Sequence, residues 1–467
     1  MLSKKTQFLL ICVLFILSGV AALIYQITWF KHLSYFLGNS TYAQAVVLAT
    51  FMGGLAIGSW WWGKKADESK NPLMLFAWLE ILIGLYCFFY MPIFEGIKSV
   101  FISVVVSNEW PSDSGIVLLL KVFASASAII VPTILMGGTL PVLVKCLSER
   151  IEEVGKNVAI LYFINSLGAA IGGVLAGFYL LGKFGLTVTT YFGATMDFIV
   201  GVLFLIIAVK YTDTQSEKPQ TISSKKETKL FVLSKQQYKI VLLIAGVSGL
   251  CAMMYEVAWL RLLIPILSST TYSFTIILTA FISGITIGSL IVYYTLPYIK
   301  NPYLFLGLCQ AGIVLSIFLS LPFYEKTPYY IWHTIGVNNN EIGGYENYLS
   351  VQFLYVFMLM IIPTIFMGMS LPVASKIVVR DVKDSGKSVG NIFAVNTIGT
   401  VIGSLMAGML FIPSIGIKHT IDIAIVLNLL LAVIVLFGKT GLKRNGRIVF
   451  GILLIGSLLI YISEVKQ

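Results

Sequence analysis

A stretch near the N-terminus of this chain returns in its second half. Residues Ser18–Ser59 begin SGVAALIYQITWFKHL and end TYAQAVVLATFMGGLAIGS, and residues Ser248–Ser289 begin SGLCAMMYEVAWLRLL and end TYSFTIILTAFISGITIGS. Equivalent positions lie 230 residues apart throughout both stretches. Self-similarity at a fixed offset marks a tandem duplication. Any fold for this chain must therefore use each structural unit twice.

The match continues further along both copies. PTILMGGTLPV at Pro132–Val142 answers PTIFMGMSLPV at Pro363–Val373, now at an offset of 231 residues. We predict that the added residue lies in loops around 94–115 and 324–348, because loops tolerate insertions and packed segments do not. The duplication divides the chain into a first repeat at 1–209, a polar linker at 210–237, a second repeat at 238–438 and a C-terminal segment at 439–467.

The composition is that of a protein embedded in a lipid bilayer. Hydrophobic residues make up 58% of the chain and charged residues 11%, whereas a soluble domain has about 25% charged residues. The apolar runs reach the ~20 residues that a transmembrane helix needs and lack the alternation of a membrane β-barrel. The N-terminal run resembles a signal peptide, but it continues through Trp29 and has an internal copy at Tyr238–Trp259. We therefore predict that it is the first span.

The apolar runs predict an all-α integral membrane protein with about 13 spans. Each repeat holds an even number of spans, six, so both copies begin on the same side of the membrane. This parallel arrangement is that of major-facilitator-type transporters and differs from an inverted repeat. The predicted spans are 7–36, 41–62, 72–93, 116–144, 155–182 and 186–209 in the first repeat, 238–266, 271–297, 302–323, 349–377, 387–413 and 418–437 in the second, and a C-terminal helix at 446–462.

The distribution of Lys and Arg predicts the orientation. The net charge is +11, but the basic residues gather in loops on one side of the predicted spans, which is the positive-inside pattern and not a nucleic-acid-binding stripe. We expect an inner-membrane protein with a cytoplasmic N-terminus, an external C-terminus and no nucleic-acid partner. The residues on the cytoplasmic side are Lys4, Lys5, Lys64, Lys65, Lys145, Arg150, Lys156, Lys376 and Arg380.

Ionisable residues inside the predicted spans are the sharpest functional signal, because each destabilises the membrane-embedded state unless it is paired or hydrated. Glu80 and Asp197 lie at mid-depth in the third and sixth spans, and their repeat equivalents are the neutral amides Gln310 and Asn428. These spans are peripheral in a major-facilitator arrangement. The two acids are therefore either ion-binding groups or protonated, hydrogen-bonded structural groups.

The first and seventh spans reverse this asymmetry, with Gln26 in the first repeat and Glu256 in the second. Both spans line the cavity in that architecture, so Glu256 is the leading candidate for a cation or proton site at the interface between the repeats. Lys31 and Arg261 follow five residues later, where they either join this site or extend to lipid phosphates. Lys121 is a further cation in the outer half of its span.

Paired amides and prolines complete the candidate set. Asn165 and Asn396 lie at similar depth, and we expect both to be buried and hydrogen-bonded between helices, because an unpaired amide in hydrocarbon is costly. Pro132 and Pro363 each free one helix carbonyl and mark either a fixed kink or the hinge of a gating helix. The Cys and His residues are not at ligand spacing, so we predict no metal site, no cofactor and no catalytic residues.

Four motifs resemble the membrane region of the membrane-fused spermidine synthases, also described as fused major-facilitator/spermidine-synthase proteins. They are SGxxALxYExxWxRLL, TYAxxxxLAxFMxGLAxGSxxxGxxAD, PTxLMGxTLPxL and GxxYxxNxxGAxxGxxxAG. The resemblance covers nearly the whole chain twice, and the first repeat departs from it at Gln26, where the second keeps Glu256. In that family the spans precede a soluble aminopropyltransferase domain with a Gly-rich loop. No GGGDG follows an apolar strand here, so we do not expect an enzyme.

These observations predict transport or membrane handling of a small solute, with a polyamine or another cation as the candidate class, by rocking of the two repeats about a central site. The alternative is a non-transporting membrane module that anchors or recruits a separate spermidine-synthase-like enzyme or another membrane assembly. A water-accessible cavity at mid-depth, lined by polar residues of both repeats, would favour the transporter.

Overall fold

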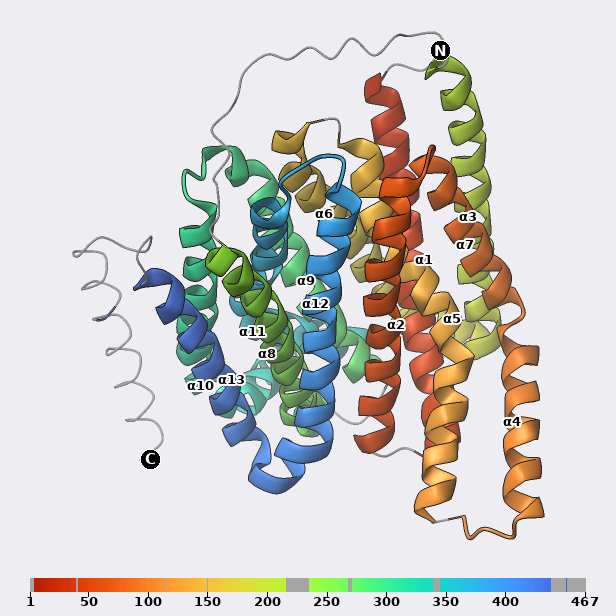
Figure 1. Ribbon diagram of the computed structural model, residues 1–467. Coiled ribbons are helices and arrows are strands. Elements are labelled where there is room, and N and C mark those ends of the chain that lie inside the picture. Colours follow the sequence, from red (N-terminus) through yellow and green to blue (C-terminus); the bar gives the residue numbers. More distant parts are fainter. Residues whose placement is uncertain are drawn as a thin grey trace.

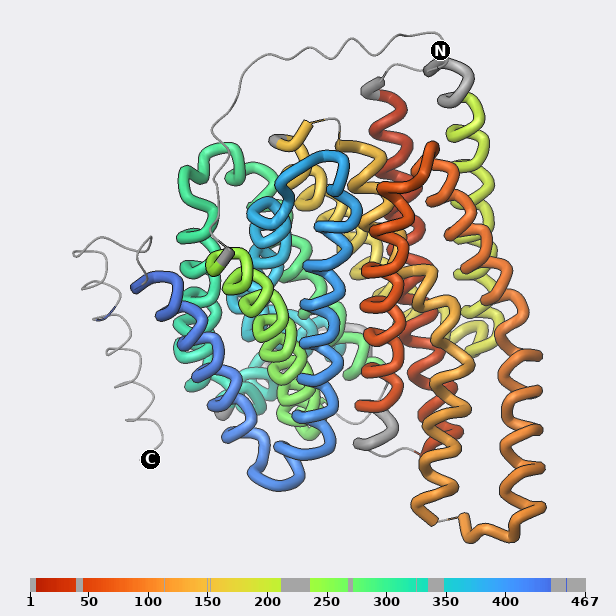
Figure 2. Tube along the Cα trace, viewed as in Figure 1, coloured from red at the N-terminus to blue at the C-terminus, as the bar shows by residue number. Residues whose placement is uncertain are grey.

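The computed structural model describes residues 4–38, 41–112, 114–148, 150–215, 235–267, 271–338, 345–437 and 451. Within these ranges the chain is helical apart from short turns, which confirms the all-α prediction (Figure 1). The helices form one bundle. Those of the first half lie on one side, red to yellow in Figure 2, and those of the second half lie on the other, green to blue.

The two halves present their helices in the same order. The first half contains α1 (Lys4–Leu37), α2 (Thr41–Glu68), α3 (Pro72–Phe88), α4 (Tyr90–Ser107), α5 (Gly115–Leu147), α6 (Ile151–Val174), the π-helix η1 (Leu175–Leu180) and α7 (Leu181–Gln215). The second half contains α8 (Lys235–Leu267), α9 (Thr271–Thr295), the 3-10 turn η2 (Leu296–Tyr298), α10 (Pro302–Asn338), α11 (Tyr345–Val378), α12 (Ser385–Leu405), the π-helix η3 (Met406–Phe411) and α13 (Ile412–Leu436).

Ten helical stretches of the described residues are long and apolar enough to cross a membrane. Two of them, Glu153–Lys210 and Ser385–Leu436, contain 58 and 52 residues, well beyond the ~20 that one crossing needs. Each holds a glycine in the left-handed region, Gly185 at φ 73° and Gly416 at φ 83°, where other residues are strained. Figure 2 shows the chain turning back between α12 and α13. Each stretch thus consists of two arms joined at its glycine.

Glycines let the helices of each repeat pack backbone against backbone. A Cβ atom at Gly58 of α2 would overlap the carbonyl oxygen of Ile134 in α5, and one at Gly288 of α9 would overlap that of Ile365 in α11. Glycines join α1 to α6 and α8 to α12 in the same way. Small residues allow such close approach between membrane helices. The duplication in sequence is therefore also a duplication in helix packing.

The predicted loops at 94–115 and 324–348 are largely wrong. The first is helical through Ser107 and the second through Asn338. Residues 94–107 contain no proline, so nothing removes a donor from the helical hydrogen-bond ladder. Figure 1 shows the result as a pair of helices, α4 and the start of α5, that extends below the neighbouring helices.

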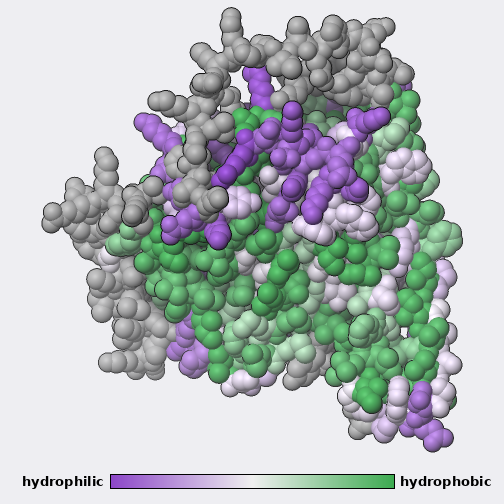
Figure 3. Space-filling view, viewed as in Figure 1, coloured by the Kyte–Doolittle hydropathy of each residue, from purple (hydrophilic) through white to green (hydrophobic). Residues whose placement is uncertain are grey.

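Two other predictions fall mostly outside the described residues. The structure describes the thirteenth span at 446–462 only at Gly451, and it describes the linker at 210–237 only at its two ends. The distribution of hydrophilic and hydrophobic residues is visible directly. Figure 3 shows hydrophilic side chains gathered at the upper end of the bundle and a broad hydrophobic belt below them, as expected for an amphiphilic membrane protein.

Candidate substrate cavity

A cavity of about 300 Å³ lies between the two halves of the bundle. Most of its wall is made of residues that occupy equivalent positions in the two repeats, so it lies where the repeats face each other. The equivalent pairs are Gln26 and Glu256, Met52 and Ile282, Leu55 and Ile285, Met136 and Met367, Thr139 and Ser370, Leu140 and Leu371, Tyr162 and Phe393, and Asn165 and Asn396.

Four of the residues singled out by sequence line this cavity. Glu256 is only 5% exposed. Gln26 on α1 also lines the cavity. The structure thus places an acidic side chain and its neutral equivalent in the lining of one cavity.

The two asparagines behave differently from each other. Asn396 Nδ2 on α12 donates a hydrogen bond of 2.9 Å to the carbonyl oxygen of Ala245 on α8, as expected for a helix-to-helix contact. The Asn165 amide has no such bond to any residue that the structure describes. Both side chains are partly exposed rather than buried, because they border the cavity. Asn165 therefore keeps its donor and acceptor available to a ligand.

Apolar and aromatic side chains form the rest of the wall. Four methionines line the cavity, and methionine is flexible enough to fit ligands of several shapes. Aromatic rings offer faces that attract cations. These lining residues are Met52, Met136, Met253, Met367, Tyr162, Phe281 and Phe393. The cavity is therefore suited to a ligand that combines apolar surface with a small number of polar groups.

A smaller pocket of about 30 Å³ adjoins the cavity and is also lined by Gln26 and Glu256. Arg261 lines this pocket, together with Phe30 of α1 and Phe274 of α9. The rings of Phe30 and Phe274 are stacked, with centroids 4.4 Å apart. This stack joins the first repeat to the second beyond Gln26, away from the N-terminal end of α1.

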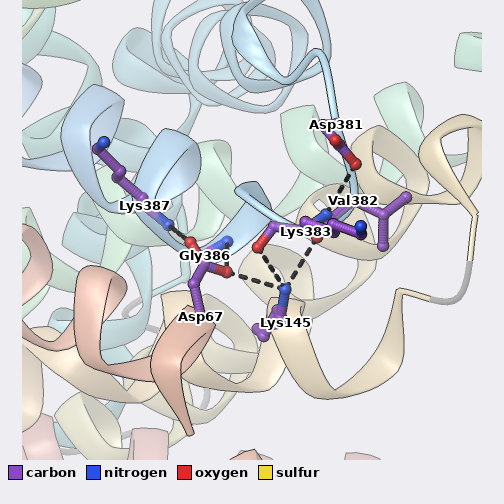
Figure 4. Close-up of polar contacts among 7 residues, drawn as sticks. All are labelled: Asp67, Lys145, Asp381, Val382, Lys383, Gly386 and Lys387. Atoms are coloured by element: carbon purple, nitrogen blue, oxygen red, sulfur yellow. Dashed lines mark hydrogen bonds and ion pairs between the residues drawn. The ribbon is translucent and has the colours of Figure 1, made fainter.

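At the opposite end of the bundle a polar network joins the repeats (Figure 4). Asp67 of α2 and Lys145 of α5 form an ion pair of 3.0 Å, with side chains 12% and 16% exposed. Lys145 Nζ also donates to the carbonyl oxygens of Val382, at 3.0 Å, and Lys383, at 2.6 Å. Both carbonyls lie between α11 and α12. We call these contacts the Asp67–Lys145 network.

Asp67 also binds the N-terminus of α12. Its carboxylate accepts hydrogen bonds from the backbone N–H groups of Gly386, at 3.0 Å, and Lys387, at 2.7 Å. A carboxylate at a helix N-terminus is stabilised by the unpaired N–H groups and by the helix dipole. A Cβ atom at Gly390 would overlap the carbonyl oxygen of Ser59. The ion pair therefore lies at the end of α2, next to a close backbone contact between α2 and α12.

The second repeat lacks the acidic half of this network. Lys376 is the equivalent of Lys145, but Pro297 occupies the position of Asp67. Lys376 Nζ instead donates to the carbonyl oxygen of Leu296 at 3.1 Å, within its own repeat. The polar connection between the repeats is thus asymmetric, although the helices around it are duplicated.

Five sequence candidates do not line the cavity. Glu80 and Asp197 are buried between α3 and α7, at 0% and 2% exposure. Lys31 and Lys121 line neither the cavity nor the adjoining pocket. Arg261 reaches only the adjoining pocket. The structure therefore separates the candidates into a cavity group, a buried acidic pair, and three cations that do not line the cavity.

The predicted hinge prolines lie inside continuous helices, α5 and α11. Pro132 cannot bond the carbonyl oxygen of Ala128, one turn earlier. The Tyr86 hydroxyl of α3 donates to that oxygen at 3.0 Å. The carbonyl that Pro141 frees, on Gly137, accepts from Ser59 Oγ at 2.8 Å. The hinge role of Pro132 and Pro363 remains a prediction.

Sequence reasoning missed the Asp67–Lys145 network and most of the cavity wall. The sequence pattern gives Lys145 only a place in the positive-inside bias and gives no signal for Asp67. The repeat offers a signal for part of the wall, because for eight pairs of equivalent positions both members line the cavity. Serines and threonines were overlooked because they are common in membrane helices. Those that line the cavity are Ser59, Thr139, Ser248, Ser370, Thr397 and Thr400.

Comparison with known proteins supports the fold. No protein-family model and no curated protein sequence matches the chain. Its structure is similar to one described as the crystal structure of a bacterial homologue of the iron transporter ferroportin in an outward-facing state, with a TM-score of 0.56. The match covers 91% of this chain and 98% of that chain at 12% sequence identity. At this identity the likeness indicates a shared polytopic membrane fold and says nothing of a shared substrate.

Proposed function

We propose that this protein is a membrane transporter that binds a small organic cation, with polyamines as the candidate class, in the cavity between its two halves. Rocking of the halves about this site would open it to each side of the membrane in turn. The observation that carries the proposal is the cavity of about 300 Å³, built from equivalent residues of both repeats and containing the carboxyl group of Glu256.

The lining chemistry supports an organic cation. A linear polyamine alternates ammonium groups with methylene chains. The Glu256 carboxylate can accept charge-assisted hydrogen bonds from an ammonium group, while Gln26 and Asn165 offer neutral acceptors. Methionine and aromatic side chains can cover the methylene chain. The resemblance to the membrane region of spermidine synthases points to the same class of solute.

The neighbouring structure is described as a homologue of an iron transporter. For this chain we favour an organic cation over iron. The described residues contain no group of three or more His, Cys, Asp or Glu side chains that could hold a metal ion, and transition metals are usually held by several such ligands.

We further propose two parallel repeats of six helices each, followed by a thirteenth helix, in an inner membrane with the N-terminus in the cytoplasm. Two observations support this arrangement. The turns at Gly185 and Gly416 divide each of the two longest helical stretches into two arms. The Asp67–Lys145 network brings the end of α2 against the start of α12. Both elements are predicted to lie at the cytoplasmic side.

In this mechanism the Asp67–Lys145 network holds the cytoplasmic ends of the two halves together. Opening the cavity to the cytoplasm separates Lys145 from the carbonyl groups of Val382 and Lys383 and removes Asp67 from the α12 N-terminus. These are charge-assisted hydrogen bonds, which contribute about 1.5–3 kcal/mol each in partly buried sites. The network can therefore set the balance between the two access states.

Thermal unfolding of the purified full-length protein tests the proposed ligand class. Spermidine is the probe, and N-acetylspermidine, which has one ammonium group fewer, is the matched control. We expect spermidine to raise Tm in a concentration-dependent way, since a ligand at 100-fold its Kd stabilises the folded state by about 2.7 kcal/mol. The acetylated control should give a smaller shift. Equal shifts, or none, would exclude the polyamine assignment, and co-purification of a separate enzyme would favour the anchor alternative.

A further inference from the structure

A second polar centre lies outside the cavity, in the first repeat. Glu80 on α3 and Asp197 on α7 are 0% and 2% exposed, and their carboxyl groups lie within interaction distance of each other. Ser18 Oγ on α1 donates a hydrogen bond of 2.8 Å to Glu80 Oε1. Two acidic side chains thus share one apolar interior, although each would carry a negative charge in water at neutral pH.

Three oxygen atoms of this centre have no hydrogen-bond partner among the described residues. They are Oε2 of Glu80, Oδ1 of Asp197 and the hydroxyl of Tyr25. Tyr25 is 0% exposed, and its hydroxyl lies near Asp197 without a hydrogen bond to it. Buried polar atoms are rarely left unpaired in native proteins, so such atoms call for a partner that the protein side chains do not supply.

The second repeat has amides at the two acidic positions; their oxygens are also without a partner among the described residues, but their N–H groups donate hydrogen bonds. At the equivalent positions Gln310 Nε2 donates to Ser370 Oγ at 3.1 Å and to Ser248 Oγ at 3.4 Å. Asn428 Nδ2 donates to the Tyr255 hydroxyl at 3.1 Å. Amide groups carry hydrogens that can be donated, whereas ionised carboxylates only accept. The two repeats therefore have nearly the same side-chain shapes but differ in donor hydrogens.

We propose that Glu80 and Asp197 form a proton-binding site that holds one shared proton at neutral pH. Two adjacent carboxylates in an apolar interior repel each other, and the repulsion is relieved when one of them is protonated. The bound proton also supplies the donor that an amide supplies in the second repeat. The site is thus a protonatable version of a hydrogen-bond centre that the second repeat builds from neutral groups.

A proton fits this site better than a metal cation. The described residues offer no group of three metal-ligating acidic, Cys or His side chains, and Ser18 already uses its hydrogen on Glu80. The other titratable groups that interact with Asp197 are Tyr25 and Cys87, which are neutral at pH 7. Tyr86 and Tyr90 interact with Cys87 and not with either carboxyl group. No described Lys or Arg is among the groups that interact with either carboxyl.

Helix α1 connects this site to the cavity. Ser18 and Tyr25 both lie on α1, and Gln26, the residue after Tyr25, lines the cavity. A movement of α1 that accompanies solute binding would therefore change the surroundings of the carboxyl pair. This link rests on the proposed transport function, whereas the shared proton does not.

Infrared spectroscopy of the full-length protein in lipid tests the shared proton directly, because a protonated carboxyl group absorbs separately from a carboxylate. The test variant is Glu80→Gln with Asp197→Asn, which gives the first repeat the amides that the second repeat already accommodates. Glu256→Gln is the matched control, because it removes the buried carboxyl of the cavity. If the double variant does not fold, Glu80→Gln and Asp197→Asn are measured singly.

We expect a protonated-carboxyl band at neutral pH that persists in Glu256→Gln, is lost in the double variant and disappears when the pH is raised. The intensity of the band at neutral pH should be the same in buffers with and without sodium. A spectrum without this band at neutral pH, or a band that appears only when sodium is replaced by a large organic cation, would overturn the proposal in favour of two carboxylates or a metal-ion site. Neither result depends on whether the protein transports a polyamine.

Discussion

Glu256 and Gln26 occupy the same position in the two repeats and line the same cavity. The packing at this position accepts a neutral amide in one repeat, so the helix does not require the charge of Glu256. A side chain of nearly the same shape is therefore available as a test of the charge alone.

We predict that Glu256→Gln folds normally but loses spermidine binding. A charge-assisted hydrogen bond contributes about 1.5–3 kcal/mol, so the Kd should rise on the order of tenfold or more. Titration calorimetry in detergent measures the Kd, and the thermal unfolding of the free variant serves as the folding control. An unchanged Kd would show that the carboxyl group does not bind the solute.

At Pro132 we predict that the Tyr86 hydroxyl replaces the missing backbone donor. Tyr86→Phe should lower the free energy of unfolding by about 1 kcal/mol, since it leaves the Ala128 carbonyl unpaired. In a Pro132→Ala background the backbone N–H of residue 132 restores that bond, so Tyr86→Phe should cost much less. Unfolding measurements on both single variants and the double variant give this comparison. Equal costs in the two backgrounds would refute the pairing.

At the scale of helices, small residues decide which surfaces meet. On α2, a Cβ atom at Gly58 would overlap the backbone of Ile134, whereas one at Gly53 would meet nothing within 4 Å. The two glycines lie on one helix and differ in this respect, which provides a matched pair of substitutions.

We predict that Gly58→Ala destabilises the protein by about 1–3 kcal/mol, the usual cost of overpacking. Gly53→Ala should be neutral or slightly stabilising, because alanine favours a helix by about 0.5–1 kcal/mol over glycine. Thermal unfolding of both variants makes the comparison. Similar effects at the two positions would mean that α2 and α5 are not in close contact.

The Asp67–Lys145 network is predicted to control access from the cytoplasm. Lys145→Met should increase thiol labelling of a Thr397→Cys cavity reporter from the cytoplasmic side, on the order of tenfold for a weakening of about 1.4 kcal/mol. Lys376→Met is the control, since Lys376 bonds only within its own repeat. An equal rise in labelling in the control, or no rise in Lys145→Met, would show that the Asp67–Lys145 network does not control access to the cavity.

The sequence predicts helices well where apolar length decides, and poorly where local geometry does. The duplication and the apolar runs place α1, α2, α5, α8 and α9 closely. Hydropathy does not detect the π-helices η1 and η3, because they are a change of hydrogen-bond register within an apolar run. The sequence also gives no signal for the helical extension of α4, because the single inserted residue favours a loop there.

For the whole molecule, the sequence identifies four polar residues of the cavity wall but does not identify the network that joins the two repeats at the other end of the bundle. Polar groups inside transmembrane spans are costly unless they are paired or functional. This cost makes four residues of the wall identifiable from the sequence: Gln26, Glu256, Asn165 and Asn396. Asp67 is not identifiable, since a carboxylate next to basic residues in a loop looks like an ordinary solvated charge. Its role depends on the N-terminus of α12, where Gly386 lies 319 residues further along the chain.

In the proposed function the two halves carry a small organic cation across the membrane. Uptake of labelled spermidine into liposomes that contain the purified protein tests this transport. We predict saturable uptake above that of protein-free liposomes, its loss in Glu256→Gln, and competition by unlabelled spermidine but not by N-acetylspermidine at the same concentration. Uptake equal to that of protein-free liposomes by a folded, spermidine-binding protein would show that the protein does not transport spermidine.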